Sequence, residues 1–232
     1  MQNVEIAIAG ERLVARASGA LHWPAAGLLA VGDLHLGRGS GQALRGGPFL
    51  PPYAEADTLD RLAAEIERTD PRIVLCLGDS FDDAAAAERV AASLAGALAP
   101  LAAGRDWLWI AGNHDPRPLR AGSLPGAWQD AFARGPLVFR HIAAEAAPPP
   151  GAGEISAHFH PKAQLFSRGA RISRRCFLAD RRRAILPAFG TFTGGLDACD
   201  PAFDPLFGRE ARALMIGSRV TPVPRARLFE RA

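Results

Sequence analysis

Features that define several other classes of protein are scarce in this sequence. The three cysteines, Cys76, Cys176 and Cys199, are an odd number at unrelated spacings, so neither a disulfide framework nor a zinc knuckle is predicted. No apolar run is long enough to span a bilayer, so we expect no membrane partner. The first fifteen residues lack the basic region, apolar core and cleavage site of a secretory signal. A reducing cytoplasm is the simplest location.

Lysine is almost absent, because Lys162 is the only lysine among 27 basic residues. The net charge at pH 7 is only +3, so the chain has no basic coat overall. A GC-rich genome, which favours arginine codons, explains the arginine bias without any function. The alternative is selection for planar, bidentate contacts to phosphate, which arginine makes better than lysine.

The apolar pattern predicts one domain over residues 1–232, in which strands alternate with helices. A hairpin that turns at Ala9-Gly10 opens the chain. Helices are predicted at 53–71, at 82–104 with an interruption at Pro100, and at 126–135. Further strands are predicted at 27–37, 72–80, 106–115, 136–141, 154–160, 171–179, 184–189 and 211–220. This order indicates an α/β fold of layered sheets, with a ligand site at the carboxyl ends of the strands.

Histidines and carboxylates gather where the predicted strands end. Every histidine except His22 falls at such a place. The ends read Gly32-Asp33-Leu34-His35, Gly78-Asp79, Gly112-Asn113-His114-Asp115, Arg140-His141 and His158-Phe159-His160. Taken singly, each polar residue has a structural explanation: a helix N-cap, a turn residue, a core imidazole or, for the last two histidines, a polar stripe on a strand. Taken together, uncompensated carboxylates and imidazoles on one surface are costly unless cations bind between them, and two divalent cations fit.

These blocks resemble, in the same order, the signature blocks of calcineurin-like metallophosphoesterases. "GDLH", "GDSFDD", "GNHD", the lone His141 and "HFH" carry the resemblance, between residues 32 and 160. It implies a four-layer αββα sandwich of two mixed β-sheets with a dinuclear metal centre at the strand ends. The arginine-rich C-terminal portion, about residues 168–232, is expected to complete the second sheet.

The resemblance also implies roles for particular residues. The ligands of one metal would be Asp33, His35, Asp79 and His160, and those of the other Asp79, Asn113, His141 and His158, with Asp79 bridging. His114 would contact the phosphate and protonate the leaving oxygen, while Asp115 orients its ring. Oxygen and imidazole ligands suit manganese, iron or zinc, and the resemblance favours Mn²⁺. Two such cations, roughly 3.5–4 Å apart, can clamp a phosphate oxygen and generate a hydroxide nucleophile.

Two further stretches narrow the resemblance to one bacterial clade. "HFHPKAQL" and "ILPAFGTFTGGLD" resemble the ligase-associated DNA-damage-response endonucleases, which are encoded beside a helicase, a DNA ligase and an exonuclease. This implies manganese-dependent cleavage of single-stranded or branched DNA, and a functional association with those three proteins. One position departs from the clade pattern: Asp82 stands where a histidine is expected. A carboxylate there would repel a phosphate unless it were protonated or turned toward a metal, so rate and leaving-group preference stay open.

A basic segment follows the last histidine block and can be interpreted in two ways. Its arginines are Arg168, Arg171, Arg174, Arg175, Arg181, Arg182 and Arg183. They form either a solvated strand face or a rim that tracks DNA phosphates, with Arg174, Arg175, Arg181 and Arg182 as the predicted contacts. Phe177, Phe189 and Phe192 are candidates for base stacking, and each is also a candidate for the core.

Three functions remain in competition. The first is a DNA endonuclease that acts in DNA repair. The second is a phosphoesterase of small molecules such as cyclic nucleotides, since the metal centre is common to both. The third is a non-catalytic scaffold, which is weakened because every ligand position is filled and His114 is present.

Overall fold

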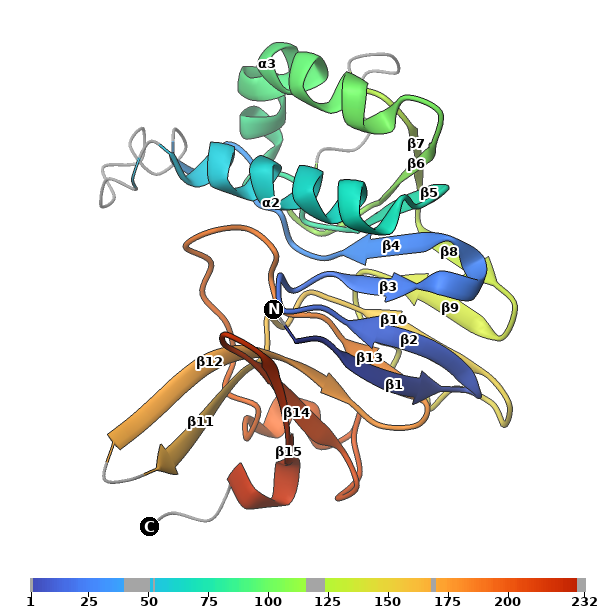
Figure 1. Ribbon diagram of the computed structural model, residues 1–232, viewed down its shortest axis with the longest axis vertical. Helices are drawn as coiled ribbons and strands as arrows, with labels where there is room; N and C mark the ends of the chain where they lie inside the picture. Colours follow the sequence, from blue (N-terminus) through green and yellow to red (C-terminus); the bar gives the residue numbers. More distant parts are fainter. Residues whose placement is uncertain (1, 40–50, 52, 116–123, 168–169, 229–232) are drawn as a thin grey trace.

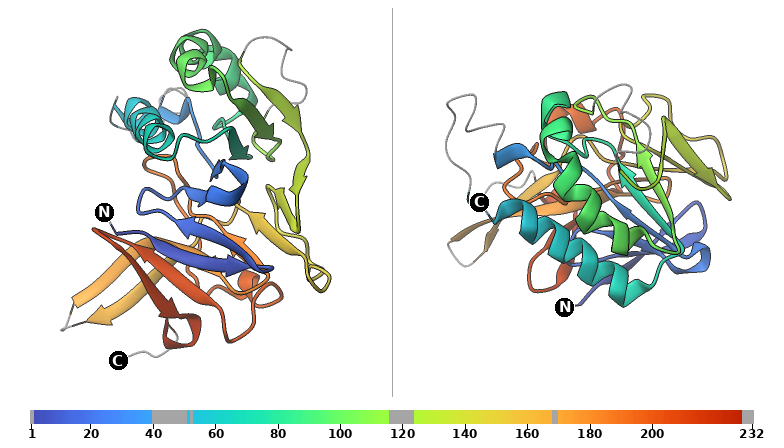
Figure 2. Two further views of the ribbon diagram at one scale, coloured as in Figure 1. Left: turned by 45° about the vertical axis from the view of Figure 1, so that its right-hand side comes forward. Right: turned by 90° about the horizontal axis from the view of Figure 1, so that it is seen from above.

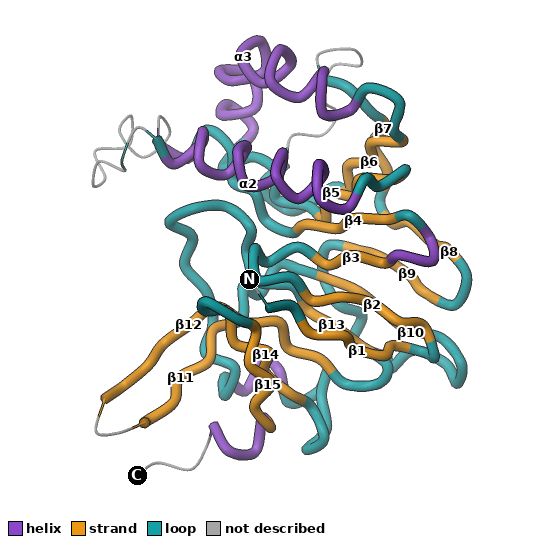
Figure 3. The backbone as a smooth tube through the Cα atoms, in the orientation of Figure 1, coloured by secondary structure: helices purple, strands orange, loops and turns teal. Residues whose placement is uncertain are grey.

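The structure is a computed structural model that describes residues 2–39, 51, 53–115, 124–167 and 170–228. Two β-sheets pack face to face, and the two long helices cover the outer face of one of them (Figure 1). When the chain is coloured by secondary structure, these helices lie together at one end of the molecule (Figure 3). Within the described residues, no helix combines the length and apolar character needed to cross a membrane.

The first sheet has seven strands in the order of the sequence. They are β1 (Val4–Ile8), β2 (Glu11–Ala15), β3 (Leu21–Trp23), β4 (Leu28–Val31), β5 (Ile73–Leu77), β6 (Asp106–Ile110) and β7 (Ala127–Gln129). Strands β1 to β4 run antiparallel to one another, whereas β4 to β7 are parallel. The parallel strands therefore place their carboxyl ends along one edge.

Two helices make the crossovers between the parallel strands. Helix α2 (Ala54–Thr69) joins β4 to β5, and α3 (Ala84–Ala102) joins β5 to β6. They contact each other and cross the same face of the sheet (Figure 2). The predicted interruption at Pro100 is wrong, because α3 continues through it to Ala102. Proline there removes only the hydrogen bond to the carbonyl of Gly96, which lies on the exposed side where water can reach it.

The second sheet contains eight strands and is also mixed. They are β8 (Ala131–Arg134), β9 (Leu137–Arg140), β10 (Gly153–Ser156), β11 (Lys162–Ser167), β12 (Ala170–Ala179), β13 (Arg183–Ile185), β14 (Arg212–Ile216) and β15 (Val220–Pro224). Strand β10 is parallel to β9 and β13, and the other pairs are antiparallel. Strands β11 and β12 extend beyond the rest of the sheet as a projecting hairpin (Figures 1 and 2).

The helix predicted at 126–135 is wrong. This segment forms β7 and β8, one strand in each sheet. Trp128 of β7 stacks on Trp109 of β6, with ring centroids 5.5 Å apart, and Phe132 of β8 packs on Phe139 of β9. Pairing with two different sheets outweighs the helix propensity of the three alanines, which is weak compared with tertiary packing.

Three buried hydrophobic clusters separate four layers. The first lies between the helices and the first sheet and includes Leu62, Leu94 and Trp107. The second lies between the sheets, and the third lies on the outer face of the second sheet. Phe203, in the 3₁₀ helix η2 (Pro201–Phe203), belongs to this third cluster. The α/β sandwich is therefore confirmed; in the described residues its fourth layer is built from η2, η3 (Arg225–Leu228) and loops. A third 3₁₀ helix, η1 (Pro24–Ala26), joins β3 to β4.

Candidate metal centre

The polar strand ends of both sheets meet at one place. From the first sheet, Asp33 and His35 follow β4 and Asp79 follows β5. From the second sheet, His141 follows β9 and His158 follows β10. The alternative of a polar histidine stripe along a strand is wrong, because β10 ends at Ser156 and both later histidines lie beyond it.

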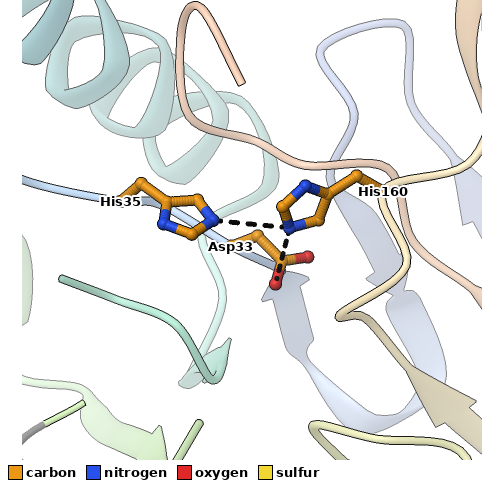
Figure 4. A group of neighbouring side chains, drawn as sticks. All are labelled: Asp33, His35 and His160. Atoms are coloured by element: carbon orange, nitrogen blue, oxygen red, sulfur yellow. Dashed lines mark hydrogen bonds and ion pairs between the residues drawn. The ribbon is translucent and has the colours of Figure 1, made fainter. Parts of the chain in front are cut away.

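The first of two ligand clusters consists of Asp33, His35 and His160 (Figure 4). The Nε2 atom of His160 lies 3.2 Å from Oδ1 of Asp33 and 3.4 Å from Nε2 of His35. Asp33 is fully buried; Nε2 of His160 points toward its carboxylate, and Nε2 of His35 points toward Nε2 of His160 (Figure 4). Three donor atoms from the two sheets thus face one small volume.

The second cluster consists of Asp79, His141 and His158. Nε2 of His141 lies 3.3 Å from Oδ2 of Asp79 and 3.2 Å from Nδ1 of His158. Asn113 adds an oxygen, because its Oδ1 lies 3.0 Å from the same Nε2. Nδ1 of His141 lies 2.8 Å from the carbonyl oxygen of Leu77, to which it can donate, and this leaves Nε2 free to accept a cation.

The two clusters adjoin each other. Nδ1 of His141, in the second cluster, lies 3.9 Å from Oδ1 of Asp33, in the first, and the amide of His158 donates to the Asp33 carboxylate. The structure therefore brings together all seven residues that were predicted as ligands. Asp79 contacts residues of the second cluster directly, and its sharing between two metals stays a prediction.

The backbone at this centre is held in an uncommon conformation. Five of the seven predicted ligands have a positive φ: Asp33, His35, Asp79, His158 and His160. Residues with a β-carbon adopt this left-handed region at a cost of order 1–3 kcal/mol each, and such residues cluster at functional sites. Close packing also requires glycine nearby, since a β-carbon on Gly112 would lie 2.1 Å from the amide nitrogen of Asp79.

Charge at the centre suits a divalent cation. Asp33 and Asp79 are both almost fully buried, and within the described part of the chain neither pairs with a lysine or an arginine. Burial alone raises the pKa of Asp79, but hydrogen bonding to His141 and its charge outweigh this and hold that pKa at about 2. Burial lowers the pKa of His35 to about 4, and its Nδ1 is buried without a hydrogen-bond partner. Carboxylates and imidazole nitrogens are the donor set that a divalent transition metal requires, and a bound cation would take the place of the proton that these carboxylates favour on His141.

The structure gives His114 and Asp115 different partners from those predicted. The exposed ring of His114 lies with Nδ1 3.0 Å from the backbone carbonyl of Asp82, not against Asp115. The buried Asp115 carboxylate accepts hydrogen bonds from the amides of Phe81 and Gly112, at 3.1 and 2.8 Å. Asp115 therefore ties together the loops that follow β5 and β6, and burial raises its pKa to about 6.

Asp82 lies beside Arg38 and the predicted ligand His35. Its Oδ1 lies 3.8 Å from Nε of Arg38 and 3.9 Å from Nδ1 of His35. Arg38 offsets the negative charge that Asp82 brings to this edge of the site. No substrate contact of Asp82 follows from this geometry.

The basic segment does not form one surface. Arg181 and Arg182 precede β13, and the carbonyl of Arg182 accepts from the amide of Glu154 at the start of β10. Because His158 follows the opposite end of β10, to which β13 is parallel, the expectation of a rim beside the metals is wrong for these two arginines. The remaining members differ: Arg171 and Arg174 are exposed on β12, Arg183 is buried against Glu154, and Arg168 lies outside the described residues.

Arg175, one of the predicted DNA contacts, lines a cavity that also includes the predicted ligand His160. The cavity is about 350 Å³ in volume, and His160 lies on its wall. Of the three phenylalanines, Phe177 and Phe189 are fully buried in the core, whereas Phe192 is 47% exposed and lines this cavity. Arg61 of α2 lines it as well, and the sequence offered no signal for this because Arg61 precedes His160 by almost a hundred residues.

Comparisons with known proteins agree with the fold and the site. The family model for calcineurin-like phosphoesterase matches residues 27–164, which include every proposed ligand. No curated protein matches the chain. Among solved structures, the crystal structure of Pseudomonas putida nuclease MPE superposes with a TM-score of 0.71 at 24% identity, over 96% of this chain and 100% of that chain. The chain belongs to the calcineurin-like phosphoesterase family.

Proposed function

We propose that this protein is a phosphodiesterase with a dinuclear metal centre, and that it cleaves single-stranded or branched DNA as an endonuclease. The observation that carries the proposal is the convergence of seven ligand residues in two adjoining clusters at the edge where both sheets end. Similarity in fold to a solved nuclease supports a nucleic-acid substrate. A small phosphate ester such as a cyclic nucleotide remains the alternative substrate.

The proposed ligands of one metal are Asp33, His35, Asp79 and His160, and those of the other are Asp79, Asn113, His141 and His158. Two bound divalent cations would activate the attacking water and withdraw charge from the phosphate. We propose Mn²⁺, because the donors are oxygen and imidazole without any thiolate, and because the sequence resembles manganese-dependent nucleases. Iron and zinc suit the same donors.

His114 is the proposed general acid. Its ring lies beside that of His35, with centroids 5.6 Å apart, and it is exposed at the mouth of the site. The carbonyl oxygen of Asp82 accepts from Nδ1–H, so Nε2–H of the imidazolium is left for the substrate. A proton held there can pass to the leaving oxygen as the P–O bond breaks.

The biological setting is proposed from the clade resemblance. It is DNA repair in the cytoplasm, in functional association with a DNA ligase, a helicase and an exonuclease. A basic, aromatic cavity beside His160 gives the site a place for a nucleic-acid strand, and its lining includes Arg175 and Phe192.

One assay separates the candidate functions. The metal-free protein is incubated with labelled single-stranded, duplex and forked DNA, with cyclic nucleotides, and with each of Mn²⁺, Fe²⁺, Zn²⁺ and Mg²⁺. We expect Mn²⁺-dependent internal cleavage of the single-stranded and forked DNA. Hydrolysis of cyclic nucleotides without cleavage of any DNA would establish the small-molecule alternative instead.

A further inference from the structure

The cavity beside His160 concentrates positive charge. Lys162, Arg175 and Arg61 line it, and Asp57 is the only carboxylate among its described lining residues. The three cations come from β11, β12 and α2 respectively. Because the predicted ligand His160 lines the same cavity, a group bound in the cavity would lie next to a phosphate bound at the metal centre.

Two of these cations face each other across paired strands. Lys162 and Arg175 are direct partners in the antiparallel register of β11 and β12. The guanidinium of Arg175 donates to the backbone carbonyls of Ala188 and Ser18, at 3.0 and 2.8 Å, which fix it at the wall of the cavity. Burial lowers the pKa of Arg175 to about 10, with the charge of Arg61 as a further cause, so the guanidinium is still charged at neutral pH.

Arg61 is held in position and still has capacity to bind. Its Nε lies 3.0 Å from Oδ2 of Asp57, and its Nη2 donates to the carbonyl of Phe189 and the hydroxyl of Thr191. Its Nη1 is buried without a hydrogen-bond partner in the described part of the chain. A buried guanidinium nitrogen without a partner is costly, so Arg61 is a cation at the cavity wall whose hydrogen-bonding capacity is not filled.

An aromatic platform borders the cations. Phe192 lines the cavity, is 47% exposed, and has a φ of 62°, which is rare for a bulky side chain. Tyr53, 61% exposed, lies beside it with ring centroids 6.3 Å apart. Exposed aromatics next to cations are the combination with which proteins bind unpaired bases and the phosphates that join them.

We infer that this cavity is a subsite for the nucleotide that flanks the scissile phosphate. Its phosphate lies among Lys162, Arg175 and Arg61, and its base stacks on Phe192. The inference rests on the proposed nuclease function and gives a reason for preferring single strands, because a base paired in a duplex cannot turn onto the ring. Apart from His160, none of these residues belongs to the metal centre.

The test uses two variants of the manganese-loaded full chain, Lys162→Gln and Phe192→Ala, since neither side chain belongs to the buried core. Matched controls are Arg181→Gln, an exposed cation at the other end of the sheet, and Phe166→Ala, a 59% exposed aromatic on the projecting hairpin. Cleavage of a fluorescein-labelled oligothymidylate is compared with hydrolysis of bis(p-nitrophenyl) phosphate. Metal content and thermal unfolding are measured for every variant.

For Phe192→Ala we expect KM for the oligonucleotide to rise by about 5- to 100-fold, as for the loss of one stacked base. For Lys162→Gln we expect the slope of log affinity against log salt to fall by about 0.7, as for one phosphate contact on a single strand. In both variants the loss on the oligonucleotide should exceed the loss on the small ester, and the controls should match the wild type.

Other outcomes contradict the inference in distinguishable ways. If the wild type cleaves the oligonucleotide and both variants behave like their controls, the subsite is refuted while the nuclease function stands. Equal losses on the two substrates mean that the residues support the fold, which also refutes the subsite. If the wild type hydrolyses only the small ester, the proposed nuclease function itself has failed, and the subsite with it.

Discussion

A single carboxylate, Asp79, holds several parts of the metal centre at once. Its Oδ1 accepts from the amide of His114, its Oδ2 faces His141, and its backbone carbonyl accepts from the amide of His35. It is buried and has a left-handed backbone, so the surrounding structure fixes its position. Removal of the Asp79 side chain should therefore change the positions of more than one of the predicted ligands.

We predict that Asp79→Ala abolishes hydrolysis of any phosphodiester and lowers the bound metal, because the carboxylate is the ligand proposed to serve both ions. Metal content is measured by mass spectrometry after dialysis against Mn²⁺. Asp60→Asn, which changes an exposed carboxylate on α2, is the control and should keep full metal and activity. Two metals per chain in the Asp79 variant would contradict the bridging assignment.

His114→Ala should leave the metals in place and reduce the maximal rate by about 10²–10⁴, the usual contribution of a positioned general acid. The structure supports an effect on the rate without an effect on metal binding, because the His114 ring contacts the Asp82 carbonyl and belongs to neither ligand cluster. An ester with a p-nitrophenol leaving group, which needs no proton, should lose much less. Equal losses on oligonucleotide and activated ester would leave His114 as a phosphate contact without an acid role.

At the scale of the elements, Gly96 and Gly112 each follow an alanine in the sequence, but the structure has room for a side chain at Gly96 and none at Gly112. Gly96 lies on the exposed side of α3, where an added β-carbon would have nothing within 4 Å of it, whereas Gly112 lies in the loop after β6 against Asp79. Helix interiors disfavour glycine through its entropy in the unfolded chain, and close backbone contacts demand it.

Gly96→Ala should raise the free energy of unfolding by about 0.5–1 kcal/mol with unchanged metal content. Gly112→Ala should lower the free energy of unfolding and also lower the metal content, because the new methyl group would displace the backbone of Asp79. Urea unfolding with and without Mn²⁺ measures both effects. If Gly96→Ala destabilises the protein, α3 is not helical at that position.

At the scale of the whole molecule, the proposed metals join the two sheets. Each cluster takes ligands from both: Asp33 and His35 with His160, and Asp79 with His141 and His158. Bound ions would cross-link sheets that are otherwise held together by the apolar cluster between them.

Removal of metal with a chelator should therefore lower the thermal midpoint. Free Mn²⁺ at about 100 times its Kd stabilises the folded protein by about 2.7 kcal/mol per site, through preferential binding to the native state. Scanning calorimetry at a series of Mn²⁺ concentrations measures the shift. The Asp79→Ala variant is the control, and its midpoint should depend much less on Mn²⁺; the same dependence in both proteins would place the stabilising ion elsewhere.

The sequence by itself predicted the seven residues that the structure brings together at the centre, and most of the elements that present them. The reason is local: Asp33, His35, Asp79 and His141 come directly after buried strands, and parallel strands bring their carboxyl ends to one edge. Helix α2 was predictable for a similar reason, because its buried residues Leu62 and Ile66 recur at helical spacing and Pro71 follows its end.

Only the tertiary structure decided what lies around that centre. Arg181 and Arg175 are six residues apart on one stretch of chain, yet the turn between β12 and β13 puts Arg181 at the far end of the sheet and leaves Arg175 beside His160. Residues 126–135 became strands because two sheets offered partners. Arg61 reached the cavity because α2 packs across the first sheet. Contacts between residues distant in sequence depend on how layers pack, and no local pattern encodes them.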